Sequence, residues 1–356
     1  MCGIAGYLVN RYERVEPEWI STLLRSIRQR GPDDEGVCRI SRPDRRIWRY
    51  ATERSSPAVT SQCDHYAAAG PAHDTALLHT RYSIIDLNDR SHQPFVSRDG
   101  STCAVFNGEI YNYRQLREEL SQSGVEFQTQ ADTEVLLRSY QAWGKAALQR
   151  VRGMFAFAIW DRRARRLFCA RDPFGKKPLY FHWSGRAYSC ASEAEAVVTG
   201  LPGRPGVETE HLAYFLLQGY YPGGRTAYTS VGTIGPGVCV EVDIDMGTLR
   251  EQAYVQTSFR MNSSRPEDED DLESRCQGAL STAVKRRYES DVPVGIVLSG
   301  GVDSSLVTLT AARHGLPIQT FTVSFLEATH DESSFAAQVA KKVDSDHRVI
   351  EVAPHR

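Results

Sequence analysis

The sequence lacks any strong excess of charge and any long apolar run. Its 356 residues carry 42 lysines and arginines against 44 aspartates and glutamates, a formal net charge of -2. A chain so nearly balanced has no overall attraction for nucleic acid or for an anionic membrane, which favours a small-molecule partner. No apolar stretch approaches the roughly 20 residues that span a bilayer, and the N-terminus does not resemble a secretory signal. We therefore expect a cytoplasmic protein.

Paired cysteines are also missing. The eight cysteines form no CxxC pair and no compact Cys/His cluster, which argues against a disulfide framework and against a zinc site. The exception among them is Cys2, which becomes the first residue once the initiator methionine is removed. A terminal cysteine supplies nucleophile and base together, because its free α-amine lies within reach of its own thiol. Position alone favours a buried small hydrophobic residue at Cys2, so other residues must decide.

The hydrophobic content of 41% is enough for two globular domains in a chain of this length. Up to about Tyr254, short alternating strands are interrupted by helices predicted at 18–28, 113–121 and 133–143. This pattern indicates a mixed α+β domain. Residues 41–73 are polar and weakly periodic, which predicts a long surface excursion or a partly disordered loop, without assigned chemistry.

A second domain is predicted after an acidic linker. The stretch 262–271 is acidic and free of apolar residues, so we place a linker at 261–271 and a helix from about Leu272. The order strand, loop, helix, strand, helix, strand follows over 272–356. This order predicts a parallel, doubly wound α/β sheet.

The string LSGGVDSS at 298–305 lies between a predicted strand and a predicted helix. Its two glycines allow a tight turn with outward N–H groups, its serines add hydroxyls, and the helix N-terminus adds partial positive charge. An anion site is therefore predicted, although a glycine-rich turn with a helix cap is the structural alternative. No GK[ST] follows, so the string is not a Walker A loop and γ-phosphate transfer is disfavoured.

Eight strings occur in register along the first domain, and together they carry far more weight than one short motif. They are CGIAG, RGPDDEG, HTRYSIIDL, SHQPF, FNGEIYN, DTEVLL, RGMFAFAIWD and RDPFGKKPLYF. This series resembles the glutaminase domain of class II glutamine amidotransferases, which are N-terminal-nucleophile hydrolases. The resemblance implies a four-layer αββα sandwich over 2–260 with a C-terminal hairpin.

The same resemblance implies how glutamine is hydrolysed. Cys2 attacks the side-chain amide of glutamine and gives a glutamyl thioester and ammonia. The Asn107 side chain and the Gly108 backbone N–H stabilise the oxyanion, and donors of this kind are worth about 2.7 to 4 kcal/mol each. A turn-forming role is the structural alternative for Asn107.

Three further positions are implied to bind the substrate. Arg81 matches the residue that holds the α-carboxylate of glutamine, and Asp132, with Glu109 beside it, matches the site of the α-ammonium. A surface ion pair is the structural alternative for Arg81.

In the second domain, SGGVDSS resembles the pyrophosphate-binding loop of ATP pyrophosphatases, which are adenine nucleotide α-hydrolase-like and adenylate a substrate. In that family the aspartate of the loop, here Asp303, helps to hold Mg²⁺. A glutaminase followed by this loop is typical of the asparagine synthetase (glutamine-hydrolysing) family of carbon–nitrogen ligases. The resemblance implies an ATP-dependent activation of a carboxylate, most simply the β-carboxylate of aspartate, and a tunnel that delivers ammonia; it also allows a homodimer. The implied ATP-binding residues are Leu298, Ser299, Gly300, Gly301, Val302, Asp303, Ser304 and Ser305.

The sequence departs from the family at several places. Gln29 replaces the usual histidine before RGPD, Tyr254 is followed by valine instead of tryptophan, and 41–73 is longer than expected. Members of the family continue well beyond the position of Arg356, so the second domain is expected to be incomplete and the acceptor is not encoded in this stretch. The alternatives are an amidotransferase for a surface polysaccharide or secondary metabolite, an amide ligase like β-lactam synthetases or lasso-peptide cyclases, and a non-catalytic fragment. The amide ligases generally lack a working N-terminal cysteine, so Cys2 counts against them.

Overall fold

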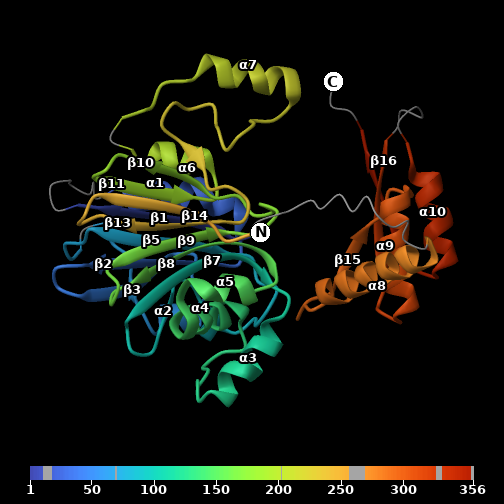
Figure 1. Ribbon diagram of the computed structural model, residues 1–356, viewed down its shortest axis with the longest axis horizontal. Coiled ribbons are helices and arrows are strands. Elements are labelled where there is room, and N and C mark those ends of the chain that lie inside the picture. The colour runs from blue at the N-terminus through green and yellow to red at the C-terminus, as the bar shows by residue number, and fades with distance from the viewer. Residues whose placement is uncertain (11–17, 69, 202, 256–268, 326–330, 354–356) are drawn as a thin grey trace, which may run out of the picture. The chain divides into compact units, whose positions relative to one another are not determined.

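The computed structural model describes residues 1–10, 18–68, 70–201, 203–255, 269–325 and 331–353 (Figure 1). The chain divides into two compact units, Met1–Ser258 and Phe259–Arg356. Of the predicted linker, residues 261–268 lie outside the described residues, whereas 269–271 begin helix α8. None of the described helices is long and apolar enough to cross a membrane.

Two sheets form the centre of the first unit. All their strand pairs are antiparallel except β3 with β4. The eight-stranded sheet has the order β12 (Gly232–Thr233), β10 (Tyr180–Trp183), β11 (Ala187–Ala191), β1 (Gly3–Val9), β5 (Thr75–Arg81), β2 (Asp34–Ser41), β3 (Arg46–Ala51) and β4 (Asp64–His65). The six-stranded sheet has the order β14 (Thr248–Ala253), β13 (Val238–Asp243), β9 (Arg166–Arg171), β8 (Gly153–Asp161), β7 (Thr102–Ile110) and β6 (Phe95–Val96).

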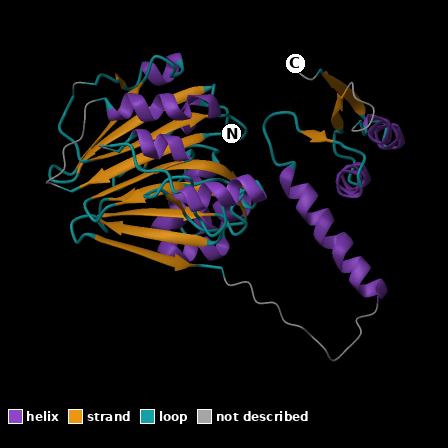
Figure 2. Ribbon diagram, turned by 90° about the horizontal axis from the view of Figure 1, so that it is seen from above, coloured by secondary structure: helices purple, strands orange, loops and turns teal. Residues whose placement is uncertain are grey.

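The two sheets pack face to face and helices cover their outer faces (Figures 1 and 2). Leu8 of β1 and Trp160 of β8 belong to one apolar cluster between the sheets. Separate clusters join each outer face to its helices. The predicted αββα sandwich is therefore confirmed. The covering helices are α1 (Trp19–Ile27) and α6 (Ala194–Thr199) on the eight-stranded sheet, and α3 (Tyr113–Gln122), α4 (Asp132–Trp143) and α5 (Ala147–Arg150) on the six-stranded sheet.

The three helices predicted from apolar periodicity are confirmed as α1, α3 and α4, with ends that differ by at most one residue from the prediction. In α1 the buried residues recur at helical spacing, which is the pattern of one face packed against a sheet. They are Ile20, Leu23, Leu24 and Ile27. A further helix, α7 (Thr209–Gln218), has no buried residue.

The prediction that residues 41–73 form a surface excursion or a partly disordered loop is wrong in part, because the segment contains regular structure. This segment contains β3, the short helix α2 (Pro57–Thr60) and β4. Strand β3 pairs in register with β2, with Ile47 opposite Ile40. Near the edge of a sheet, polar side chains remain in water on the exposed positions of a strand, so the apolar alternation that identifies strands is weak here.

The second unit holds a three-stranded parallel sheet in the order β15 (Gly295–Val297), β16 (Gln319–Phe325) and β17 (Asp346–Val352). Helices α9 (Val302–Arg313) and α10 (Ser333–Lys342) connect these strands, and the predicted α/β order is confirmed. Helix α8 (Glu269–Arg287) begins three residues before the predicted start at Leu272. Acidic residue types are favoured at a helix N-terminus, which explains why the helix takes in the end of the acidic stretch.

Candidate active site

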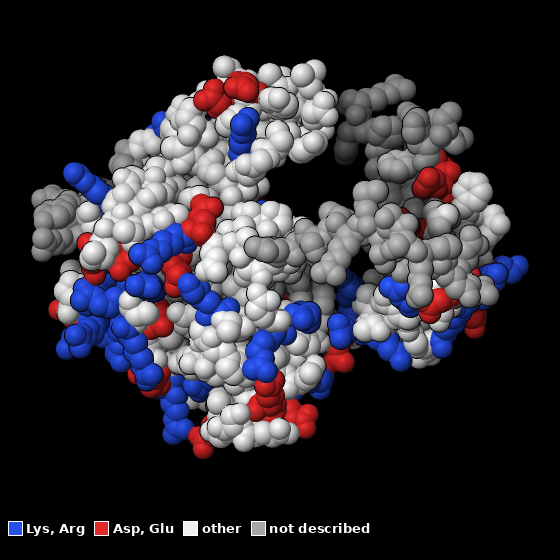
Figure 3. Space-filling view, in the orientation of Figure 1, with Lys and Arg blue, Asp and Glu red and all other residues white. Residues whose placement is uncertain are grey.

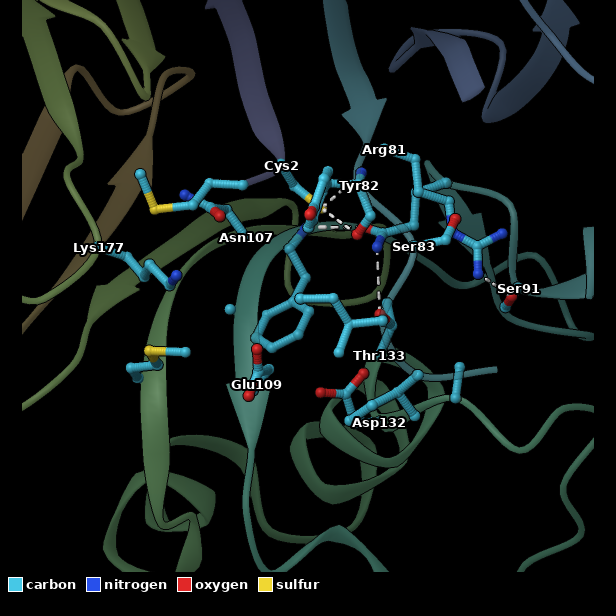
Figure 4. A pocket seen from close by; sticks show the side chains of 18 residues that line it. Cys2, Arg81, Tyr82, Ser83, Ser91, Asn107, Glu109, Asp132, Thr133 and Lys177 are labelled. Atoms are coloured by element: carbon cyan, nitrogen blue, oxygen red, sulfur yellow. Dashed lines mark hydrogen bonds between the residues drawn. The ribbon is translucent and has the colours of Figure 1, made fainter. Parts of the chain in front are cut away.

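A pocket of about 220 Å³ opens in the first unit where β1, β5 and β7 come together (Figure 4). The structure brings all the residues predicted for glutamine hydrolysis to this one pocket. They are Cys2, which precedes β1, Arg81 at the end of β5, Asn107, Gly108 and Glu109 on β7, and Asp132 at the start of α4.

The register of β1 places Cys2 beside the end of β5. Gly3 lies opposite Thr80, so the Cys2 thiol reaches the residue that follows Arg81. The backbone N–H of Tyr82 donates a hydrogen bond to Cys2 Sγ at 3.3 Å. Burial raises the pKa of the Cys2 thiol, while the backbone hydrogen bond, the chain terminus and Arg81 act in the opposite direction. A base is therefore needed to remove the thiol proton.

No histidine is among the described residues that line the pocket. His79, from the string HTRYSIIDL, is buried, and burial lowers its pKa to about 3. Its Nε2 is 3.1 Å from the carbonyl oxygen of Phe106, so His79 is a neutral structural residue. The chain terminus does lie in the pocket, because Met1 is one of its lining residues, and burial lowers the pKa of the Met1 ammonium. Because its pKa is lowered, a larger fraction of an amine at this place is neutral and basic at a given pH than of an amine exposed to water.

Asn107 presents an unused donor to the pocket. Its side chain is only 1% exposed, and its Nδ2 has no hydrogen-bond partner among the described residues. A buried amide without a partner is costly and calls for an explanation. The next residue, Gly108, must be glycine because a Cβ there would lie 2.2 Å from the carbonyl oxygen of Met154 on β8. This close approach fixes β7 and the Asn107 side chain at the wall of the pocket.

Arg81 is a buried cation whose described partners are all neutral. Its side chain is 6% exposed and donates hydrogen bonds to the carbonyl oxygens of Asn88, at 3.2 Å, and Asp86, and to Ser91 Oγ, at 2.6 Å. No carboxylate of the described residues lies within ion-pair distance. The surface ion pair considered from the sequence is therefore excluded. The guanidinium is held in a fixed orientation with its charge available to an anion.

Asp132 is a buried carboxyl group on the opposite wall of the pocket (Figure 4). Burial raises its pKa to about 7, and the nearby charge of Glu109 acts in the same direction. The backbone N–H of Ile110 donates to Asp132 Oδ2 at 3.0 Å, which holds the side chain against β7. A bound cation would favour the ionised form of Asp132 and offset the cost of burial.

The sequence analysis missed two basic residues, one that holds the backbone of Cys2 and one that lines the pocket. Arg30, within RGPDDEG, donates from Nε to the carbonyl oxygen of Cys2 at 3.1 Å and pairs with Glu193 at 2.5 Å, so it fixes the backbone of Cys2. Lys177, within RDPFGKKPLYF, lines the pocket, and burial lowers its pKa while Glu109 and Cys2 oppose this effect. Both residues lie in the strings that carry the resemblance, which is the signal that could have found them.

In the second unit, the loop 298–301 joins β15 to α9, as the sequence predicts. Gly300 has a φ of 85°, and a Cβ there would lie 2.6 Å from the backbone nitrogen of Ala336. Ser299 Oγ accepts from the N–H of Gly301 at 3.3 Å and lies 3.1 Å from Ser304 Oγ. The loop therefore presents its hydroxyls beside the N-terminus of α9, a suitable arrangement for an anion. Asp303 lies in the first turn of α9.

An αββα sandwich with a cysteine directly before its central strand is the architecture of N-terminal-nucleophile glutamine amidotransferases. A solved structure of glutamine phosphoribosylpyrophosphate amidotransferase from B. subtilis, complexed with ADP and GMP, shares this fold. It aligns with 98% of this chain and 81% of its own, with a TM-score of 0.53 and 18% identity.

The model of the glutamine amidotransferase domain matches residues 63–255, and the chain belongs to this family. The model of asparagine synthase matches residues 275–356, which lie in the second unit.

Two of the curated relatives described here align over nearly the whole chain, and a third aligns over about three quarters of it. A putative glutamine-hydrolysing asparagine synthetase of Mycobacterium tuberculosis H37Rv is 33% identical over 98% of this chain and 51% of its own length. A second putative enzyme of that name, from Methanocaldococcus jannaschii, is 28% identical over 98% of this chain and 64% of its own. Asparagine synthetase 1 of Bacillus subtilis is 35% identical over 73% of this chain and 40% of its own. The chain thus spans about half the length of the relatives it matches.

Proposed function

We propose that the protein is a glutamine-dependent amidotransferase of the asparagine synthetase type, acting in the cytoplasm. The observation that carries this proposal is the pocket in which the Cys2 thiol and the unpartnered Asn107 amide lie together. A nucleophile beside a buried, unused donor is the arrangement required for attack on an amide carbonyl, because the donor stabilises the oxyanion that forms.

In the proposed reaction, the terminal amine takes the thiol proton of Cys2 and the thiolate attacks the side-chain carbonyl carbon of glutamine. The developing oxyanion accepts hydrogen bonds from Asn107 Nδ2 and the N–H of Gly108. The tetrahedral intermediate then collapses, the C–N bond breaks, and the proton passes from the amine to the leaving nitrogen. Water hydrolyses the resulting thioester to glutamate. Removal of Met1 is needed for the amine to belong to Cys2.

The substrate is oriented by charges on opposite walls of the pocket. Arg81 binds the α-carboxylate of glutamine, and Asp132 with Glu109 binds the α-ammonium. This separation selects an α-amino acid of the length of glutamine, because the amide must reach Cys2 while both charged groups are held.

The second unit is proposed to activate the carboxylate that the ammonia attacks. We propose that residues 298–305 bind ATP, that Asp303 with the phosphates would hold Mg²⁺, and that the acceptor is a carboxylate, most simply that of aspartate. A single carboxylate next to hydroxyls fits Mg²⁺, which is commonly bound by one or two carboxylates and by phosphate oxygens. The ion would neutralise phosphate charge. The relatives named asparagine synthetase support aspartate as the acceptor. A tunnel for ammonia and a homodimer remain part of this proposal.

The direct test is to measure glutamate and ammonia released from glutamine by the purified chain, with and without ATP and aspartate. Equimolar glutamate and ammonia are expected. Asparagine is expected when ATP and aspartate are present together with any remaining part of the enzyme. An absence of glutamate under all these conditions would contradict the proposal.

An Arg81→Ala variant should mainly raise the KM for glutamine, by about a hundredfold. Its contact to the α-carboxylate is made in the ground state and in the transition state alike, so the change removes uniform binding. Steady-state kinetics over a wide range of glutamine concentration measure this. Arg186→Ala, a change at an exposed arginine outside the pocket, serves as the control. A loss confined to kcat would show that Arg81 has another role.

The KM for glutamine should rise about tenfold between pH 8 and pH 6. Asp132 has a pKa of about 7 in the folded protein, so its carboxylate is lost as the pH falls through this value. An Asp132→Asn variant should have a high KM with no such dependence. The pKa of Asp132 is raised by folding, so the contribution of this residue to the stability of the folded state is present at low pH and is lost as the pH rises through 7. At pH 8 the wild type holds a buried charged carboxylate that Asp132→Asn lacks, so this variant should have the higher melting temperature at that pH. A wild-type KM that is constant from pH 6 to pH 8 would contradict this assignment.

A further inference from the structure

Two turns of the first unit carry a dense group of arginines that glutamine hydrolysis does not use. One turn joins β2 to β3 and the other joins β8 to β9. They lie together, since Arg162 Nη1 donates to the carbonyl oxygen of Arg45 at 3.4 Å. Between them is a groove of about 560 Å³, the arginine groove, which is lined by Arg42, Arg45, Arg46, Arg162, Arg163 and Arg165. In the space-filling view, basic side chains gather at the end of this unit where β2 and β3 lie (Figure 3).

The positive charge of the groove is only partly compensated. Arg45, Arg46 and Arg162 have no carboxylate partner among the described residues. The other arginines are paired with carboxylates: Arg42 with Asp74 at 3.1 Å and Asp245 at 2.6 Å, Arg163 with Asp99 at 2.8 Å, and Arg165 with Asp245 at 2.7 Å. Asp44, in the β2–β3 turn, adds one further carboxylate and accepts from Ser41 Oγ at 2.7 Å. With Asp44 counted, the six arginines of the groove face four aspartates, an excess of two positive charges in a chain with a net charge of -2. Such a concave basic surface attracts anions.

The arginine groove is separate from the glutamine pocket. Strand β1 begins next to Cys2 and ends at Val9, whose carbonyl oxygen accepts a hydrogen bond from Arg42. The seven residues of β1 span about 20 Å at the usual rise of a strand. The groove therefore lies at the opposite end of the sandwich, and an anion bound there does not touch the substrate.

The composition of the groove indicates the class of ligand. Its basic residues are all arginine and include no lysine among the described lining residues. The guanidinium is a planar fork that matches phosphate oxygens in pairs, which a lysine ammonium cannot do. The volume is typical of a small-molecule site, and a chain with a net charge of -2 has no overall attraction for nucleic acid. We propose that the arginine groove binds a small oligophosphate anion, either an inorganic oligophosphate or the phosphate chain of a nucleotide.

Calorimetric titration of the whole chain with inorganic tripolyphosphate, at about 0.15 M salt, tests this proposal. The variant R45Q/R46Q/R162Q removes the three unpaired charges of the groove. The matched control R54Q/R186Q/R225Q removes three arginine charges that are exposed, outside the groove and without a carboxylate partner in the described part of the chain. We expect binding by the wild type, a Kd at least about tenfold higher in the groove variant, and a Kd within about twofold of wild type in the control.

The proposal would be overturned if tripolyphosphate binding were weakened equally in the groove variant and the control, or if the wild type showed no measurable binding. Melting temperatures show whether the groove variant is folded. If it is not, the single change Arg46→Gln should still raise the Kd about threefold, and an unchanged Kd would count against the site. A parallel titration with ATP distinguishes an inorganic oligophosphate from a nucleotide as the ligand of the groove. Equal affinities mean that the phosphate chain alone is recognised, whereas tighter ATP binding that is lost in the groove variant means that a nucleotide is.

Discussion

A Cys2→Ala variant is expected to release glutamate from glutamine at least about 10⁴-fold more slowly than the wild type, because the change removes the nucleophile on which every later step depends. The fold should be unaffected. Cys2 precedes β1 and lines the pocket. Its thiol accepts from the backbone N–H of Tyr82 at 3.3 Å and donates to the carbonyl oxygen of Tyr82 at 3.6 Å, and it has no other hydrogen bond in the described part of the chain. The melting temperature should therefore stay within a few degrees of the wild type.

Cys63→Ala is a suitable control for this variant, because Cys63 is another free, partly buried cysteine of the first unit and lies outside the pocket. It should keep full activity. Substantial glutamine turnover by a folded Cys2→Ala protein would mean that another group attacks the amide, and the assignment of the nucleophile would be wrong.

An Asn107→Ala variant is expected to lower kcat by about 10²- to 10³-fold with little change in the KM for glutamine. Its amide has no partner in the described structure and is used only when the oxyanion forms, so its loss affects the transition state and not substrate binding. The variant should also be at least as stable as the wild type, since an unsatisfied buried donor is removed.

The stability measurement separates this role from a structural one. Asn112→Ala is the matched control, because the Asn112 side chain donates to the carbonyl oxygen of Arg150 at 3.0 Å and accepts from the N–H of Arg152 at 2.8 Å. That variant should lose stability and keep its kcat. The structure already excludes the turn-forming role considered from the sequence, because Asn107 lies within strand β7 and pairs with Ala156 of β8. If Asn107→Ala lost stability and kept its kcat, Asn107 would be a structural residue of β7 and not an oxyanion donor.

Much of the site could be predicted from the sequence, because its residues lie in short strings whose order fixes the sheet register. The string CGIAG becomes β1, HTR ends β5, and NGE lies on β7, so Cys2, Arg81 and Asn107 meet once these strands align. Periodicity was equally sufficient for α1, α3 and α4, whose apolar faces are wide and continuous.

Other properties depend on packing between distant segments and are not visible in any one string. The neutral partners of Arg81 come from a loop that folds back on it, and the pKa of Asp132 reflects burial by the surrounding sandwich. Lys177 reaches the pocket only because the chain after β9 returns to it. Strand β3 was missed because its exposed positions are polar, and the arginine groove requires two turns that are far apart in the sequence.

The most direct test of the central claim is covalent capture by 6-diazo-5-oxo-L-norleucine, a glutamine analogue whose diazoketone alkylates thiols, followed by peptide mass spectrometry. The chain has eight free cysteines, so the position of the adduct shows whether the analogue reacts at Cys2 or at thiols in general. The account predicts one adduct, on Cys2 at the N-terminus, which excess glutamine prevents and which the Arg81→Ala variant forms far more slowly. Labelling of other cysteines at a similar rate, or labelling of Cys2 that glutamine does not prevent, would contradict a glutamine site built around this residue.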